Sequence, residues 1–349
     1  MLSTQEQLAR ALLPIAFEIA GGRSRGTVRT LKGDASNRRY HRVTLEGGSP
    51  ATLIVMELGD NPMASEEASK SGPAAELPFI NVLRYLERGG IGVPKLYRYE
   101  DRAGLLFLED LGDTTLESVV QTADSETRRR YYQVAIADLV TLQRYAAATP
   151  DPSCIAFGRA FDYDLLLWEL HHFREWLLEA DRAARLAAAE QETVATAFAD
   201  IARLLADQPR GFVHRDYQSR NLMVQPGLRL RLIDFQDALL GTRAYDLVAL
   251  LRDSYVELEP ALLEDLIGEY VWCAQVPDAA AFRRLFDLQT LQRKLKDAGR
   301  FVFIDRVKKN PSFLVSIPAS LRAVRSAFER LPELAPLRRV LGRYVPELS

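Results

Sequence analysis

The sequence has few residues of the kinds that build metal clusters or cross-links, and it has almost no net charge. Its 349 residues include two cysteines, four histidines and four methionines. Cys154 and Cys273 lie far apart and have no metal-ligand spacing, so we expect free thiols in a reducing compartment. The 45 basic and 47 acidic side chains leave a formal net charge of −2, which gives no electrostatic argument for a nucleic-acid or anionic-membrane partner.

Long hydrophobic runs are missing as well. No stretch approaches the ~20 apolar residues of a membrane span. The first residues lack the basic start and continuous apolar core of a signal peptide, and they predict instead an amphipathic helix that ends at Gly21 and Gly22. We therefore expect a cytoplasmic protein, and separately we expect a monomer. Hydrophobic residues at 48% and charged residues at 26% are typical of a globular protein, and the length has room for two domains.

The first part of the chain has the pattern of a small antiparallel sheet. A helix is predicted at 73–90, and strands are predicted at 27–31, 40–45, 52–58, 94–99 and 105–109. Beyond this point the pattern is almost entirely helical apart from one hairpin. The change predicts an N-terminal domain of residues 1–109 and a C-terminal domain of residues 110–349. A boundary between two domains is a common place for a small-molecule site.

The exception to the helical pattern is a loop and hairpin within residues 211–237. Two apolar or alternating runs flank a turn that centres near Pro226. Pairing the two runs back from this turn places Asn221 close to Asp234. Asp216 lies in the preceding loop, five residues before Asn221. Two carboxylates and an amide should therefore meet at the open end of the hairpin.

These groups suit phosphoryl transfer, in which catalysis is mainly positioning and charge neutralisation. Asp216 can orient a hydroxyl group and accept its proton. Asn221 and Asp234 offer the hard oxygen ligands that Mg2+ prefers. Asp and Asn are common loop residues in any protein, but three of them at one hairpin favour a catalytic site. His214 is better explained as a buried histidine that braces the loop.

The pattern HxDxxxxN, followed by an apolar strand that ends in Ile-Asp, resembles the catalytic loop of the protein-kinase-like fold. It is most similar to the aminoglycoside phosphotransferase superfamily, and the likeness runs from about Thr27 to the C terminus. A narrower likeness, to bacterial kinases of the anomeric hydroxyl of N-acetylmuramate and N-acetylglucosamine, is carried by GDASNRRYHRV, LEDLGD, HRDYQSRNLM, IDFQDALLGTRAYDLVALLRDSY and LQRKLKDAGRF.

The resemblance implies an α+β fold of two lobes, a small N-terminal antiparallel-sheet lobe that binds nucleotide and a larger, mostly helical C-terminal lobe for catalysis and acceptor binding. It implies ATP and Mg2+ as cofactors and a small sugar acceptor of peptidoglycan recycling. Asp246 would support the catalytic loop. The residues that would contact the nucleotide are Gly33, Ser36, Asn37, Arg38, Arg39, Glu109 and Leu111. An ordinary hairpin turn and a plain interdomain linker are the alternatives for these segments.

One departure from the family pattern concerns the third strand. Kinases of this fold usually have a lysine there that holds the phosphates, but Met56 stands at about that position. Arg38, Arg39 or Arg42 could replace the lysine, because a guanidinium binds phosphate in a bidentate manner. A nucleotide-binding protein without catalytic activity is the alternative. Retention of Asp216 argues against it, because a pure binder needs no proton acceptor.

Two further segments bear on the identity of the acceptor but do not decide it. Residues 293–309 carry seven basic and two acidic side chains, for which a solvated helix face is the commoner explanation. Basic groups that reach the acceptor would favour an anionic molecule over an aminoglycoside. A helix predicted at 163–179 carries Trp168 and Trp176, which we interpret as core residues, with a stacking surface for a sugar as the alternative. Another alcohol, such as choline or an aminoglycoside, is the second hypothesis for the acceptor.

Overall fold

A computed structural model of the chain describes residues 4–21, 25–31, 38–59 and 76–349. The chain divides into two compact units. The first contains residues 1–77 and 92–113, and the second contains residues 78–91 and 114–349. An antiparallel sheet in the first unit and a mostly helical second unit confirm the predicted α+β class.

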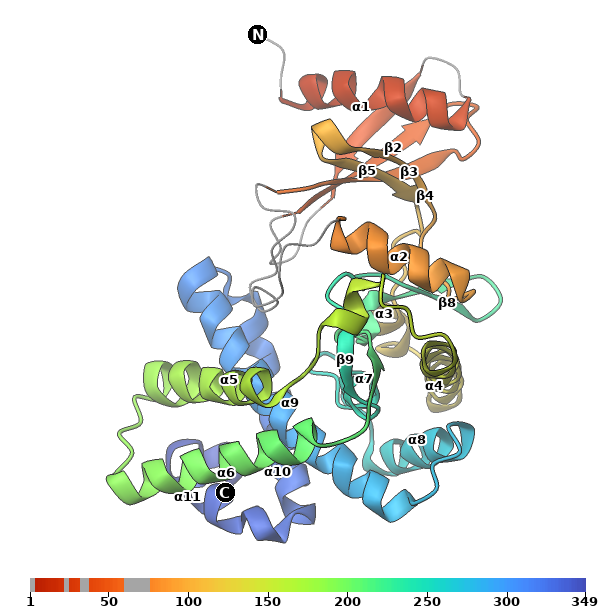
Figure 1. The fold of residues 1–349 in the computed structure, drawn as a ribbon. Helices are drawn as coiled ribbons and strands as arrows, with labels where there is room; N and C mark the ends of the chain where they lie inside the picture. Colours follow the sequence, from red (N-terminus) through yellow and green to blue (C-terminus); the bar gives the residue numbers. More distant parts are fainter. Residues whose placement is uncertain (1–3, 22–24, 32–37, 60–75) are drawn as a thin grey trace. The chain divides into compact units, whose positions relative to one another are not determined.

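The first unit is built on a five-stranded antiparallel sheet in the order β1-β2-β3-β5-β4. Its elements are α1 (Thr4–Ala20), β1 (Gly26–Thr30), β2 (Arg39–Leu45), β3 (Thr52–Glu57), β4 (Leu96–Glu100) and β5 (Leu105–Glu109). Figure 1 shows α1 lying across one face of this sheet. Leu12 and Ala16 of the helix are buried there in one hydrophobic cluster with Val43, Leu53 and Val55.

Side chains alternate between the two faces of a strand, so the neighbours of these core residues lie on the face away from α1. Arg42 and Met56 are on that second face. Met56 is opposite Leu106 in the register of β3 and β5, and it is fully buried. Met56, which stands at about the expected position of a phosphate-binding lysine, is therefore an apolar packing residue in this unit.

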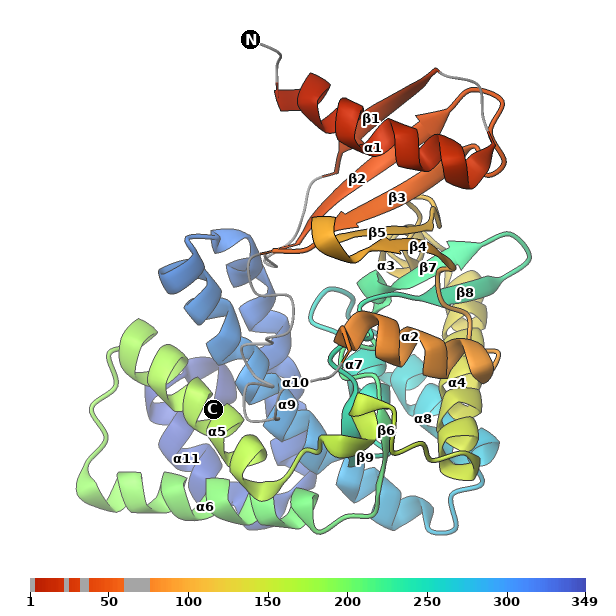
Figure 2. The ribbon, with the colours of Figure 1, turned by 45° about the horizontal axis from the view of Figure 1, so that its top comes forward.

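The second unit contains most of the helices and two small sheets (Figure 2). Its helices are α2 (Pro78–Arg88), α3 (Leu116–Val120), α4 (Ser125–Ala148), α5 (Tyr163–Phe173), α6 (Ala188–Ala206), α7 (Tyr245–Leu251), α8 (Pro260–Cys273), α9 (Ala279–Lys308), α10 (Ile317–Arg330) and α11 (Ala335–Tyr344). Its strands are β6 (Arg210–Val213), β7 (Leu222–Gln225), β8 (Arg229–Leu232) and β9 (Leu239–Thr242).

Helix α2 is shorter than its pattern predicts. It begins at Pro78, a residue whose fixed φ and missing N–H suit the first turn of a helix, and the expected residues 73–75 lie outside the described residues. The helix is grouped with the second unit. Phe79 packs there against Phe235, with the ring centroids 4.8 Å apart.

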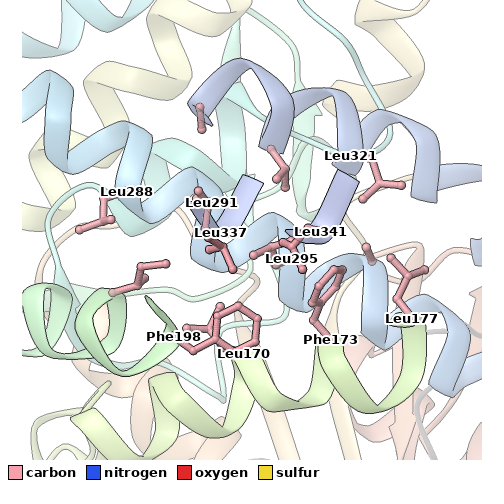
Figure 3. Packing of buried hydrophobic residues seen from close by; sticks show 14 of the residues in the cluster. Leu170, Phe173, Leu177, Phe198, Leu288, Leu291, Leu295, Leu321, Leu337 and Leu341 are labelled. Atoms are coloured by element: carbon pink, nitrogen blue, oxygen red, sulfur yellow. The ribbon is translucent and has the colours of Figure 1, made fainter. Parts of the chain in front are cut away.

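The long helix α9 is the centre of the second unit. Figure 3 shows Leu288, Leu291 and Leu295 of α9 among leucine and phenylalanine side chains from the neighbouring helices. α9 approaches α5 so closely at Gly299 that an added Cβ would lie 2.6 Å from the Cα of Phe173. Glycine is therefore required at this crossing. The close approach also brings polar side chains of α5 and α9 together next to the loop before β7.

The second unit has one sheet that we did not expect. β7 and β8 form the predicted hairpin, whose turn contains Gly227 with a φ of 77°. β6 and β9 form a second antiparallel pair, although the sequence pattern predicted no strands in this part of the chain apart from the hairpin. The prediction failed because β9 is short and pairs with a strand 26 or more residues away in the sequence, which local periodicity cannot show. No helix in the described part of the chain is long and apolar enough to cross a membrane.

Candidate active site

The hairpin brings Asn221 and Asp234 to its open end, as the turn position predicts. Leu222 is opposite Leu232 in the register. The pairing continues one step further, because the backbone N–H of Ile233 donates to the oxygen of Asn221 at 3.1 Å. Asp234 follows at once with a φ of 65°. This left-handed conformation, uncommon outside glycine but tolerated by Asp, ends the strand and turns the carboxylate out.

The ring of His214 ties the catalytic loop to the same strand. Its Nε2 donates to the backbone oxygen of Ile233 at 3.1 Å, and its Nδ1 accepts from the backbone N–H of Asp216 at 3.2 Å. This arrangement requires a neutral ring, with the proton on Nε2. Burial lowers the pKa of His214 to about 4. The ring therefore connects the backbone of the loop at Asp216 to the backbone of Ile233, the residue before Asp234.

Asp246 holds the loop from its other side. Its carboxylate accepts from the backbone N–H groups of His214 and Arg215 at 2.7 and 2.9 Å. The side chain is fully buried near the start of α7. Burial raises the pKa of Asp246 to about 7, against the two N–H groups that favour its charged form. The contact also fixes Arg215, whose φ of 81° is a strained conformation for a non-glycine residue.

The donor set at the hairpin mouth fits a magnesium ion. The Nδ2 of Asn221 donates to the backbone oxygen of Asp216 at 2.8 Å, so the amide oxygen is the atom that could bind a metal. Asp234 is exposed, and its Oδ1 accepts from Nε2 of Gln236 at 2.8 Å. Among the described residues no cluster of three His, Cys, Asp or Glu side chains could hold a metal. One carboxylate and one amide suit Mg2+, which keeps several waters and takes the rest of its ligands from phosphates.

Asp216 lies beside a buried arginine of α9. Nη2 of Arg293 donates to Oδ1 of Asp216 at 3.3 Å, and the aspartate side chain is about one-third exposed, at 35%. Burial acts to raise the pKa of Asp216, but the positive charges of Arg293 and Lys296 outweigh it, so the net shift is downward. A carboxylate in this setting is charged at neutral pH. It can therefore orient a hydroxyl group and receive its proton.

The basic residues at the start of segment 293–309 are buried, so the interpretation as a solvated helix face is wrong for them. Arg293 and Lys294 have no exposed surface, and Lys296 is 7% exposed. Asp297 compensates these charges, at 2.7 Å from Nζ of Lys294 and 3.2 Å from Nζ of Lys296. Glu169 of α5 is buried beside them and accepts from Nε2 of Gln292 at 2.7 Å. Because the opposite charges on α5, α9 and the catalytic loop neutralise one another, these side chains can be buried.

The tryptophans of the α5 segment differ in their surroundings. Trp176 is half-buried against the core, but Trp168 is 40% exposed, and the prediction of a core position is wrong for it. The ring of Trp168 stacks on His172 with centroids 5.4 Å apart. Trp176 packs edge-on against Phe303 of α9 at 5.0 Å. Trp168 belongs to α5, Phe303 to α9 and Trp176 to the helical segment Arg174–Asp181 that continues α5, so an aromatic surface lies along the helices that carry Glu169 and Arg293.

The candidate phosphate-binding residues belong to the first unit. Gly33, Ser36 and Asn37 lie outside the described residues. Arg38 comes just before β2. Arg39 is the first residue of β2, with a side chain that is 73% exposed and an Nη1 that is 3.9 Å from a carboxylate oxygen of Glu57.

Arg42 is engaged within the first unit. It forms a bidentate pair with Asp113 at 2.7 and 2.8 Å, and its Nε lies 2.8 Å from Oδ2 of Asp110. Arg42 therefore fixes the segment that follows β5. It is a poor candidate for the missing phosphate-binding lysine, because its guanidinium already has two carboxylate partners.

Glu109 and Leu111, the candidate contacts of the nucleotide base, flank Asp110. The backbone N–H of Glu109 donates to the oxygen of Lys95, and its side chain accepts from the N–H of Lys95 at 3.0 Å. Leu111 is buried at 9% exposure.

Comparisons with known proteins agree with this chemistry. Residues 27–284 match the model of a family described as the phosphotransferase enzyme family. The chain belongs to this family. Proteins named N-acetylmuramate/N-acetylglucosamine kinase are similar to it: the one from Neisseria meningitidis is 30% identical over 89% of both chains, and the one from Pseudomonas aeruginosa is 32% identical over 88% of this chain and 86% of its own.

Solved structures support the fold of this phosphotransferase. A choline kinase from Streptococcus pneumoniae has a TM-score of 0.60 at 16% identity, and it covers 92% of this chain and 97% of its own. An aminoglycoside 2'-phosphotransferase in its GDP complex also has a TM-score of 0.60, at 13% identity over 94% of this chain and 100% of its own. At these identities the likeness concerns the fold alone.

The site residues predicted from the sequence did not include Arg293 and Glu169. Arg293 is 77 residues from Asp216, and the contact between them is a product of the helix packing. One signal was available: on a helix, Arg293, Lys296 and Asp297 lie within four residues of each other, and a basic pair with an acidic partner at this spacing can neutralise itself in a buried position. The apolar residues on both sides of them support the same interpretation.

Proposed function

We propose that this phosphotransferase moves the γ-phosphoryl group of ATP, with Mg2+, to the anomeric hydroxyl of N-acetylmuramate or N-acetylglucosamine, as a kinase of peptidoglycan recycling. The observation that carries the proposal is the arrangement of Asp216, Asn221 and Asp234 on one loop and hairpin. Similarity to kinases of these two sugars over almost nine-tenths of both chains supports the choice of acceptor. A monomer in the cytoplasm remains our expectation.

In this proposal the site residues divide the work of catalysis. Asp216 accepts a hydrogen bond from the acceptor hydroxyl and takes its proton as the oxygen attacks the γ-phosphorus, while the bond from this phosphorus to the bridging oxygen breaks and ADP leaves. Asn221 and Asp234 hold the magnesium, which when bound neutralises charge on the phosphates. The buried side chains of His214 and Asp246 keep the loop in place, so little reorganisation is needed during the reaction. Arg38 and Arg39, with Gly33, Ser36 and Asn37, would cover the phosphates, and Glu109 and Leu111 would lie beside the base.

The aromatic surface on α5 and α9 supports a sugar as the acceptor. Sugar rings have an apolar face of C–H groups that packs against an aromatic ring, and binding sites usually combine such surfaces with a few polar groups. Trp168 offers an exposed ring one residue before Glu169, and Glu169 lies 3.6 Å from the guanidinium of Arg215 in the catalytic loop. Homoserine has no such face, but the trimethylammonium group of choline also binds aromatic rings, so this surface favours a sugar over homoserine and does not separate it from choline.

The purified protein should be assayed with radiolabelled ATP and Mg2+ against N-acetylmuramate, N-acetylglucosamine, choline, homoserine and an aminoglycoside. Homoserine belongs in the panel because a homoserine kinase from Pseudomonas aeruginosa is 28% identical over 68% of this chain. The methyl glycoside of N-acetylglucosamine is the matched control, because its anomeric oxygen is blocked. We expect phosphorylation of the two free sugars and none of the glycoside. A labelled glycoside would refute the anomeric position, and labelling of only another alcohol would refute the sugar.

Asp216→Asn tests the catalytic role with little change in shape. We expect a loss of turnover of about 100-fold or more, the lower end for a missing general base, with MgATP affinity unchanged in calorimetry. Asp234→Ala should lose at least as much. Near wild-type phosphorylation by either variant would refute the assignment.

Thermal stabilisation of the wild-type protein by MgATP without turnover on any acceptor would support the alternative of a nucleotide-binding protein without catalytic activity.

A further inference from the structure

Arg293 connects the middle of α9 to the catalytic loop through two different groups. Its Nη1 donates to the backbone oxygen of Arg215 at 2.8 Å, and its Nη2 donates to Oδ1 of Asp216 at 3.3 Å. The side chain has no exposed surface. A single planar guanidinium therefore holds both the peptide before Asp216 and one oxygen of its carboxylate.

The peptide that Arg293 holds is strained and fixed from both sides. Arg215 has a φ of 81°. Its N–H is bound by Asp246 at 2.9 Å, and its carbonyl is bound by Arg293. Strained backbone persists where its surroundings determine it. The direction in which Asp216 leaves the loop is therefore set by a carboxylate of α7 and a guanidinium of α9.

Arg293 is itself held in one orientation. The face of its guanidinium lies over the ring of Tyr245, with Cζ 4.8 Å from the centroid. Its Nε lies 3.9 Å from Oδ2 of Asp297, which also pairs with Lys294 and Lys296. Because Asp297 has these two lysines, loss of Arg293 would not leave it as an unpaired buried charge. A substitution at position 293 can therefore be expected to fold.

We propose that Arg293 is a positioning residue for phosphoryl transfer: it holds Asp216 so that Oδ1 is occupied and Oδ2 is presented to the acceptor hydroxyl. In the described residues no hydrogen bond reaches Oδ2, and the aspartate is partly exposed while Arg293 is not. Arg293 touches neither acceptor nor nucleotide in this account. It also lies beyond residue 284, where the match to the family model ends. The inference rests on the proposed role of Asp216.

A purely structural role for Arg293 makes a different prediction. Loss of a buried, well-packed arginine would then lower the melting temperature, and the activity would fall only with the fraction of folded protein. A positioning role predicts a fall in kcat at unchanged KM for ATP and for the acceptor, because the interaction matters in the transition state and not in substrate binding. The KM-against-kcat split therefore separates the two roles.

The test compares Arg293→Gln, Arg293→Lys and Arg283→Gln by steady-state kinetics, calorimetry with MgATP and thermal unfolding. Arg283 is the matched control, because it is an α9 arginine that pairs with Asp287 and Glu264 away from the loop. We expect Arg293→Gln to lose kcat on the order of 100-fold, the effect of a misplacement of about 1 Å, with both KM values and the MgATP affinity within about threefold. Arg293→Lys keeps the positive charge but lacks the planar pair of N–H donors of the guanidinium. Its kcat should therefore lie between the kcat of Arg293→Gln and that of the wild type. Arg283→Gln should keep the wild-type kcat.

A kcat of Arg293→Gln within threefold of wild type overturns the proposal, and so does an equal loss in Arg283→Gln. If Arg293→Gln does not fold, Arg293→Lys decides: unchanged kcat contradicts the proposal, and reduced kcat at constant KM supports it. Hydrolysis of MgATP without acceptor is measured in parallel, since water can also use Asp216. If the wild-type protein does not phosphorylate the sugars, the proposed function fails, and the effect of Arg293 is still scored on hydrolysis.

Discussion

The side-chain nitrogen of Asn221 donates a hydrogen bond to the backbone oxygen of Asp216 at 2.8 Å. This contact orients the amide: its nitrogen closes the catalytic loop, and its oxygen is the atom that we propose as a magnesium ligand. In this proposal Asn221 combines a ligand function and a loop function in the same side chain.

The two functions of Asn221 can be separated by two variants. Asn221→Asp keeps an oxygen ligand, with an added negative charge, but has no donor for the Asp216 carbonyl, so we expect lower turnover with a magnesium requirement no higher than that of the wild type. Asn221→Ala loses both and should also need about tenfold more Mg2+. Initial rates over a range of free Mg2+ distinguish them. Equal magnesium requirements in both variants would contradict a ligand role for the amide oxygen.

Asp234 should affect the magnesium requirement more strongly than Asn221 does. Asp234→Asn removes the negative charge that attracts the cation, so we expect a loss of activity and at least a tenfold higher Mg2+ concentration for half-maximal rate. Gln236→Leu removes the donor at 2.8 Å from Oδ1 of Asp234 and should cause a smaller shift in the same direction. Titration of rate against free Mg2+ measures both. An unchanged curve for Asp234→Asn would exclude it as a ligand.

Asp246 should stabilise the fold by accepting two buried N–H groups. Asp246→Asn presents one oxygen and one NH2 group, so one of the two N–H groups loses its acceptor. We expect a loss of about 1 to 3 kcal/mol in the free energy of unfolding. Urea unfolding measures it. The control is Asp265→Asn, which breaks an exposed pair with Arg129 and should cost about 1 kcal/mol or less; an equal cost in both variants would contradict the prediction.

His214 should make stability depend on pH. Burial lowers its pKa to about 4 in the folded protein, below the ordinary value of 6.5. Between pH 4 and pH 6.5 the unfolded chain binds more protons at this histidine than the folded protein does. The contribution of His214 to the free energy of unfolding is therefore complete above pH 6.5 and is lost as the pH falls toward 4. His214→Gln keeps a donor for Ile233 and cannot titrate. The melting-temperature difference between wild type and variant should therefore narrow on acidification; parallel curves would contradict this.

The arginines of β2 should have different effects on nucleotide binding. Arg39 is exposed, so Arg39→Ala should weaken ATP binding by about tenfold, the loss expected for one charge-assisted contact. Affinity for adenosine should not change, because adenosine has no phosphate. Arg42→Ala should instead lower the melting temperature, because it breaks the pairs with Asp110 and Asp113. Calorimetry with both ligands tests the difference, and equal loss for ATP and adenosine would exclude a phosphate contact of Arg39.

The sequence alone determined the parts of the protein that depend on short spacing. The strands of the first unit and the β7–β8 hairpin follow from alternation and turn residues, which act over a few positions. The same spacing placed Asn221 next to Asp234, and the motif around Asp216 indicated phosphoryl transfer. Predictions of this kind are reliable because the hydrogen-bond register of a hairpin is fixed by its turn.

Only the tertiary structure decided how the charges around Asp216 are held. The pairing of β6 with β9, the burial of Arg293 and Lys294 and the contact of Asp246 with the loop join residues that are distant in the sequence. A basic helix segment has the same composition whether it faces water or a buried carboxylate, because the partners that make burial possible come from other helices. Whether the basic segment of α9 is buried or exposed depends on the close packing of α9 against α5 at Gly299, which local sequence patterns do not encode.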